Sequence, residues 1–204
     1  MEDVDEGFDK VAWRNELESH RQEKDRIFAE SDQSPIPVEE REEFDGLEYY
    51  APDTDYRVTA TVTVHDDPET KQFNVMHGDG ETREYCHVAT FSFELHDESL
   101  SLNAYRETDQ EGPDEDGQYR YFAPFKDETS DEGTYSGGRY LEVYADEPLS
   151  DDQEITIDFN IVYTPFCAFN DSFACPLPPT DNWLDVPIEA GEKDYEPPET
   201  DDEE

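Results

Sequence analysis

Cys167 and Cys175, near the C-terminus, have the side chains that could take part in the most kinds of chemistry in this sequence. Thiolates bind zinc, act as nucleophiles and pair as disulfides. The C-x7-C spacing differs from the C-x2-4-C pairs of zinc knuckles, so a metal site would need ligands from elsewhere. Cys86 and His87 are the candidates for those ligands. As neighbours on one strand, however, they would point to opposite faces of a sheet, which argues against a shared ion without excluding it.

Four interpretations of these residues therefore stay open. One is a metal site, and another is a disulfide between Cys167 and Cys175, which a reducing cytosol would disfavour. A third is a hydrolase or redox enzyme in which a cysteine of low pKa works with His87. The fourth is a pair of buried thiols in a loop braced by prolines. The sequence contains no recognisable motif for an organic cofactor.

Arg139, in the stretch TYSGGRY, is the most prominent cation of a chain with only 14 Lys and Arg. It could form a bidentate ion pair with Asp158 or Asp127, or it could contact an anionic ligand. Tyr135 and Tyr140, on either side of it, join it as ligand-binding candidates. The Ser-Gly-Gly before Arg139 predicts a tight turn or bulge that leads into a strand. It lacks the G-x4-G-K-[ST] frame of a phosphate loop.

Asp158 and Asn160 lie in EITIDFNIVY, residues 154–163, which predicts a strand. Four apolar side chains would share its buried face: Ile155, Ile157, Phe159 and Ile161. Asp158 and Asn160 would share the opposite face. In a closed barrel that face is the lumen, where the pair would be a polar ligand contact, whereas in a sandwich it is an ordinary solvent face. Both readings stay open.

These residues must be positioned by a mainly β domain with one N-terminal helix. Residues 9–30 predict the helix, with Asp9 as its cap. Between residues 50 and 190 a period of two recurs between Gly, Asp and Pro turns, which predicts an antiparallel β-barrel or sandwich. We expect a disordered N-terminus over 1–8, a single domain over 9–193 and a disordered acidic tail over 194–204.

The charge of the chain restricts its solvent and its partners. There are 57 Asp and Glu against 14 Lys and Arg, a formal net charge of -43. Because concentrated salt shortens the Debye length to about 3 Å at 1 M, this charge predicts a halophile protein whose folding depends on salt. The chain has no basic stripe to bind nucleic acid. It also has neither a signal peptide nor an apolar run for a membrane, so we expect a cytoplasmic protein.

Several blocks of the chain match a known pattern. They are SP, then R-x-x-F-x-G-L-x-Y-Y-x-P over 41–52, PF-x-D-x-TS-x-x-x-TY-x-GGRY over 124–140, DFN-x-x-Y-x-P-x-C-A-x, CPLPP-x-x-N-x-L and I-x-AGEK up to Lys193. The sequence thus resembles the family known as domain of unknown function 1684. VYTP stands at 162–165 where similar proteins read AYNP, so Thr164 is a departure. The resemblance implies a compact, mostly β domain and brings no established activity.

Three hypotheses about function follow. The first is a domain that binds a small molecule, with anions among the candidates, in a pocket near the GGRY and DFN segments. The second is the enzyme that uses Cys167, Cys175 and His87. The third is a scaffold in which the motifs are purely architectural. The sequence does not indicate an oligomeric state or a protein partner.

Overall fold

Helix α1, Lys10–Glu30, begins at a side-chain cap. The computed structural model describes residues 7–66, 70–74, 82–108 and 112–197. The Asp9 carboxylate accepts hydrogen bonds from the N–H groups of Val11 and Ala12, at 2.9 and 3.0 Å. These N–H groups have no partner inside the helix, which is why an aspartate favours this position. The predicted helix and its predicted cap are confirmed.

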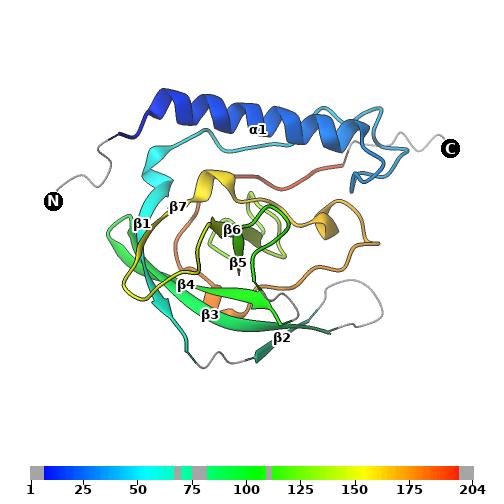
Figure 1. Cartoon of the computed structure of the whole chain (residues 1–204). Helices are drawn as coiled ribbons and strands as arrows, with labels where there is room; N and C mark the ends of the chain where they lie inside the picture. Colours follow the sequence, from blue (N-terminus) through cyan, green and yellow to red (C-terminus); the bar gives the residue numbers. More distant parts are fainter. Residues whose placement is uncertain (1–6, 67–69, 75–81, 109–111, 198–204) are drawn as a thin grey trace.

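Seven strands form one antiparallel sheet in the described part of the chain. They are β1 Arg57–Val64, β2 Thr70–Asn74, β3 Thr82–Leu95, β4 Glu98–Glu107, β5 Tyr119–Phe125, β6 Arg139–Ala145 and β7 Glu154–Asp158. Their hydrogen-bonded order is β6-β5-β4-β3-β1-β7, and β2 pairs with the start of β3. The sheet curls into a half-barrel, with β6 and β7 as its two edge strands (Figure 1).

Buried and exposed residues alternate along the strands, as the sequence predicts. In β1, Val58, Ala60 and Val62 are buried, and the threonines between them are exposed. In β3, Phe91 and Phe93 face the same core. Successive side chains of a strand point to opposite faces, so one apolar set enters the core and one polar set meets water.

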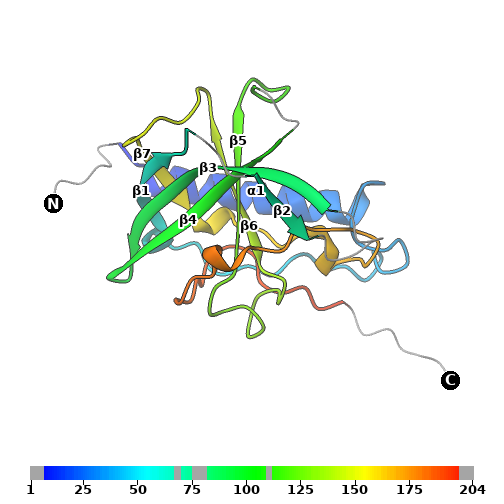
Figure 2. The ribbon, with the colours of Figure 1, turned by 90° about the horizontal axis from the view of Figure 1, so that it is seen from below.

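Helix α1 lies along one side of the domain and the curled sheet lies on the other, with the chain after β7 between them (Figure 1). Seen from below, the long strands β3 and β4 cross in front of the helix (Figure 2). Phe159, Val162 and Ile188, from the chain after β7, are at most 1% exposed. This chain therefore completes the core that the half-barrel leaves open. The predicted mainly β fold with an N-terminal helix is confirmed.

The strand predicted over 154–163 is too long. β7 ends at Asp158, and a 3₁₀ turn, Phe159–Ile161, follows it. The cause is the Asp158 side chain, which accepts a hydrogen bond from the N–H of Asn160 at 2.9 Å and so competes with the ladder. Ile161 is 47% exposed as a result, so its predicted place on the buried face with Ile157 is wrong.

Both ends of the chain are described only in part. Residues 1–6 and 198–204, most of the segments predicted to be disordered, lie outside the described residues. Tyr195, within the predicted tail, packs on Phe169 with ring centroids 4.9 Å apart. No helix in the described ranges combines the length and apolarity that a bilayer crossing needs. The cytoplasmic location and the salt dependence of folding stay predictions.

Candidate functional site

Arg139 begins β6, and its side chain is 0% exposed. Its Nη2 donates to Asp127 Oδ2 at 2.9 Å and to the carbonyl of Ile188 at 2.7 Å. Its Nη1 donates to the carbonyls of Ala190 and Glu192, at 2.5 and 3.1 Å. An ion pair with Asp127, one of the two predicted partners, is confirmed, but it is made by one nitrogen and is not the predicted bidentate pair, because the other donors of the guanidinium bind carbonyls. These carbonyl contacts join β6 to the chain at 188–192. The ligand role of Arg139 stays a prediction, and Arg139 lines neither of the two cavities described below.

Asp158 and Asn160 are brought together at the end of β7, where they join three parts of the chain. The Asn160 amide donates to Asp158 Oδ1 at 2.8 Å and to the Asp53 carbonyl at 2.7 Å. Asn160 Oδ1 accepts the N–H of Asp53 at 2.9 Å. Asp158 Oδ2 accepts a hydrogen bond from Trp13 Nε1 of helix α1 at 2.7 Å. The pair therefore holds both the segment before β1 and the helix.

Asn160→Ala should lower the free energy of unfolding by about 2–4 kcal/mol, because it removes three hydrogen bonds of a side chain that is 1% exposed, and each such bond contributes about 0.5–1.5 kcal/mol. Asn15→Ala, at an exposed position of helix α1, is the matched control and should change little. Urea denaturation at constant salt measures both variants. Equal stability of the two variants would contradict the joining role of Asn160.

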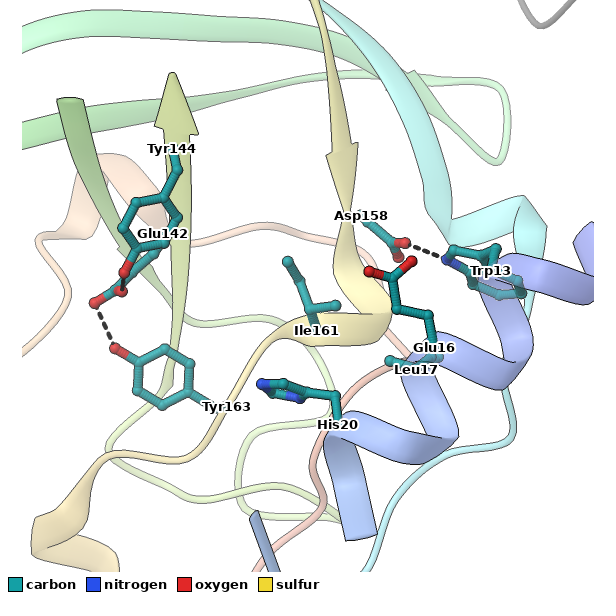
Figure 3. A pocket seen from close by; sticks show the side chains of 9 residues that line it. All are labelled: Trp13, Glu16, Leu17, His20, Glu142, Tyr144, Asp158, Ile161 and Tyr163. Carbon is teal, nitrogen blue, oxygen red and sulfur yellow. Dashed lines mark hydrogen bonds between the residues drawn. The ribbon is translucent and has the colours of Figure 1, made fainter. Parts of the chain in front are cut away.

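A cavity of about 440 Å³ lies between helix α1 and the ends of β6 and β7 (Figure 3). We call it the α1 cavity. Its lining residues are Trp13, Glu16, Leu17, His20, Glu142, Tyr144, Asp158, Ile161 and Tyr163. The described sheet ends at β6 and β7. One backbone bridge, between Tyr140 and Tyr163, joins β6 to the chain after β7, and side chains of helix α1 cover the rest of the gap. In Figure 3, Glu142 and Tyr163 lie at one end of the cavity and Asp158 with Trp13 at the other.

Glu142, like Asp158, accepts three hydrogen bonds in the α1 cavity. Its Oε1 accepts from Tyr163 at 2.7 Å and from Arg120 at 2.5 Å, and its Oε2 accepts from Tyr144 at 2.5 Å. Burial, and then the hydrogen bond to Glu142, raises the pKa of Tyr144 to about 12. Burial and the charge of Glu142 likewise raise the pKa of Tyr163. Both phenols therefore stay protonated and hold the carboxylate in one orientation.

A second cavity, of about 270 Å³, lies between the sheet and the segment 163–176, and we call it the loop cavity. Tyr163 lines both cavities. Tyr140 and Cys175, both candidates from the sequence, also line the loop cavity, and Tyr140 donates to the Pro176 carbonyl at 2.6 Å. Tyr135 donates to Cys167 Sγ at 3.9 Å. The aromatic, proline-rich segment thus roofs a cavity, as well as closing one end of the domain.

Cys167 and Cys175 are adjacent thiols in the structure, and the N–H of Cys167 donates to Cys175 Sγ at 3.2 Å. The pKa of the Cys167 thiol is raised by its hydrogen bond with Cys175 and by burial. A nucleophilic cysteine needs the opposite shift. The disulfide and metal interpretations of this pair stay predictions.

Cys86 and His87 lie opposite Arg106 and Tyr105 in the ladder between β3 and β4. The His87 ring packs against His65, with centroids 4.2 Å apart. The structure thus places His87 in a histidine pair, away from the contacts made by Cys167. Within the described ranges, no group of three or more His, Cys, Asp and Glu side chains could hold a metal ion.

The sequence analysis missed Glu142, Tyr144, Tyr163 and Glu16 as site residues. Glu142 and Glu16 could not be distinguished among 57 acidic residues. Trp13 lies within the predicted helix, but its partner, Asp158, is 145 residues away, so no local pattern could indicate their contact. The only local signal was the pair Glu142 and Tyr144, two residues apart on one strand and hence on one face.

The comparisons with known proteins agree with the resemblance found in the sequence. The chain is similar to a solved structure, the solution NMR structure of an uncharacterised protein of Haloarcula marismortui. The identity is 50%, the TM-score is 0.69, and the match covers 90% of this chain and 95% of that one. No curated protein matches the chain. Residues 42–193, more than half of the chain, match the family described as "Protein of unknown function (DUF1684)". This protein is therefore a member of the DUF1684 family.

Proposed function

We propose that the domain binds a small organic molecule in the α1 cavity. The observation that carries this proposal is the cavity itself: about 440 Å³, with aromatic and aliphatic walls and polar groups held in place by hydrogen bonds. Ligand pockets typically have volumes of about 300–1,000 Å³ and combine apolar walls with a few oriented polar groups.

The polar groups of the cavity are oriented before any ligand arrives. Asp158 is held by Trp13 and Asn160, and Glu142 is held by Tyr144 and Tyr163. Binding then requires little ordering of side chains, which otherwise costs about 0.5–1.5 kcal/mol for each immobilised chain. This preorganisation favours a binding role over a purely architectural one.

The α1 cavity adjoins the DFN segment through Asp158, whereas no residue of the GGRY segment lines it. Asp158 and Ile161 of the first segment line the α1 cavity, and Tyr140 of the second lines the adjoining loop cavity. The thiol enzyme has less support, because the pKa of Cys167 is raised and His87 packs with His65. We therefore place the ligand on the Asp158 side.

Ile161→Trp should weaken ligand binding by about tenfold or more, because an overpacked site typically costs about 1–3 kcal/mol. Ile161 lines the cavity and is 47% exposed, so the larger side chain can be accommodated by the fold but occupies ligand space. The matched control is Ile27→Trp, at a helix position with 43% exposure that does not line the cavity.

The measurement is a fragment screen by NMR on the full chain, followed by titration of each hit into both variants. Fragments that shift the signals of Trp13 and Tyr163 should lose affinity in Ile161→Trp alone. If no fragment shifts these signals, or if the hits bind both variants equally, the α1 cavity is not the binding site. Thermal denaturation of both variants verifies that they remain folded.

A further inference from the structure

The charged groups that line the α1 cavity are of one sign. Glu16, Glu142 and Asp158 are carboxylates, and no lysine or arginine is among the lining residues. Acidic residues are common over this whole chain, so their number alone identifies nothing. What distinguishes these three is that they share one half-open cavity with the rings of Trp13 and Tyr163.

The two carboxylates at the ends of the cavity retain capacity to accept hydrogen bonds. A carboxylate has about four acceptor positions. Asp158 uses three of them, for the Trp13 indole and for the backbone and side-chain amides of Asn160. Glu142 also uses three, for one guanidinium and two phenols. Each therefore keeps about one acceptor position for a ligand donor.

The cations near the cavity are already bound to the protein. One of them, Lys24, is paired with Glu192 and lies over the Tyr163 ring, with 5.2 Å from its Nζ to the ring centroid. Arg120 is paired with Glu142 and lines the loop cavity instead. Arg21 donates to the carbonyls of Tyr50 and Asn160 and stacks on the Tyr49 ring, with 4.4 Å from its Cζ to the ring centroid. Of the lining residues, only His20 can become positive, and it is exposed. The carboxylate of Glu16 is exposed too, and no cationic side chain shares the cavity with it.

The aromatic walls suit the same type of ligand. The face of an indole or phenol ring attracts a cation through its quadrupole, by about 0.5–1 kcal/mol where water has access. Trp13, Tyr144 and Tyr163 come from three separate elements and line one volume. The Tyr163 ring already has Lys24 over it, so Trp13 and Tyr144 are the rings that we assign to the ligand. An alkylammonium ion could place its charge against a carboxylate and its carbon chain on these rings.

We propose that the α1 cavity selects a small organic cation of the alkylammonium class. This inference rests on the proposed function and adds the charge of the ligand to it. It also reverses the expectation of an anion, which depended on Arg139, because that side chain is occupied by Asp127.

Three probes of equal length and different charge test the inference on the full chain: n-butylammonium, n-butanol and butyrate. Each is titrated at about pH 8, where ordinary imidazoles are mostly neutral, and at one fixed salt concentration. The readout is the indole N–H signal of Trp13, with the exposed Trp183 as an internal control. Butylammonium should bind about tenfold more tightly than butanol, and butyrate should be the weakest, since ring and carboxylate contacts each add up to about 1 kcal/mol.

Glu16→Gln removes one lining charge while keeping the shape of the side chain. It should reduce the preference for butylammonium over butanol by about threefold, the usual effect of one exposed charge pair. Glu18→Gln, on the same helix but outside the cavity, should leave the preference unchanged. An equal effect of the two substitutions would mean that general surface charge attracts the cation, which would overturn the inference.

The outcomes separate the two proposals. If butanol or butyrate binds as tightly as butylammonium, the cavity binds small molecules but does not select cations. If none of the three probes shifts the Trp13 signal, the inference fails. The fragment screen then decides independently whether the α1 cavity binds any other ligand.

Discussion

Arg139→Ala is expected to prevent folding or to leave a protein with only a small fraction of its stability. Removing one member of a buried ion pair costs about 3–5 kcal/mol, because the remaining charge is buried without compensation. Here the remaining charge is Asp127, whose side chain is 1% exposed. The carbonyls of Ile188, Ala190 and Glu192 lose their donor in the same step. Since whole domains are stable by about 5–15 kcal/mol, this loss is large.

Urea denaturation at constant salt, monitored by circular dichroism and tyrosine fluorescence, measures the free energy of unfolding. The matched control is Arg26→Ala, which removes an arginine paired with Glu23 and Glu30 on the exposed surface of helix α1. The free energy of unfolding of that variant should be close to that of the wild type. An Arg139→Ala protein as stable as Arg26→Ala would mean that the buried pair does not hold β6 to the 188–192 segment.

Gly138→Ala is expected to lower the free energy of unfolding by about 2–5 kcal/mol, from backbone strain and overpacking together. Gly138 has a φ of +92°, a region that side chains disfavour. An added Cβ would lie 2.5 Å from the Phe125 carbonyl oxygen and 2.7 Å from Pro178 Cγ. The Phe125 oxygen belongs to the backbone of β5, the neighbour of β6, and cannot move without disturbing that strand.

Gly117→Ala separates the two contributions. Gly117 has a similar φ, +84°, but nothing lies within 4 Å of its added Cβ. The free energy of unfolding of this variant should fall only by the contribution of backbone strain, about 1–2 kcal/mol. If Gly138→Ala is no less stable than Gly117→Ala, then close packing around Gly138 does not explain the glycine in the GGRY segment. Urea denaturation of both variants at one salt concentration gives the comparison.

Local patterns in the sequence were sufficient for the elements of the fold. The aspartate before a period of 3.6 predicted helix α1 and its cap, because capping depends on residues within one turn. The alternation in β1 and β3 predicted strands, because the period of two is a property of the extended backbone. The GGRY block predicted a turn before β6, which the positive φ of Gly138 supports. Each of these features is decided by neighbours in the chain.

The period-of-two pattern predicted the wrong end for β7, because the Asp158 side chain competes with the ladder there. Apolar alternation continues through Phe159 and Ile161, yet the strand ends at Asp158. The strand ends there because Asp158 and Asn160 bond to each other and to partners far away, Trp13 and Asp53. The periodicity of a segment shows which of its residues are apolar. It does not show which polar side chain will form hydrogen bonds with distant residues.

The sequence by itself therefore determined the helix, the strands apart from the end of β7, the acidic composition and the resemblance to the DUF1684 family. Only the tertiary structure decided that Asp127 is the partner of Arg139, and that helix α1 and the ends of the sheet enclose a cavity. The physical reason is the separation along the chain between the residues that interact. Secondary structure follows contacts between near neighbours. The α1 cavity instead depends on Trp13 meeting Asp158 across 145 residues and on the curl of the sheet, which brings residues of its two edge strands, β6 and β7, to one cavity.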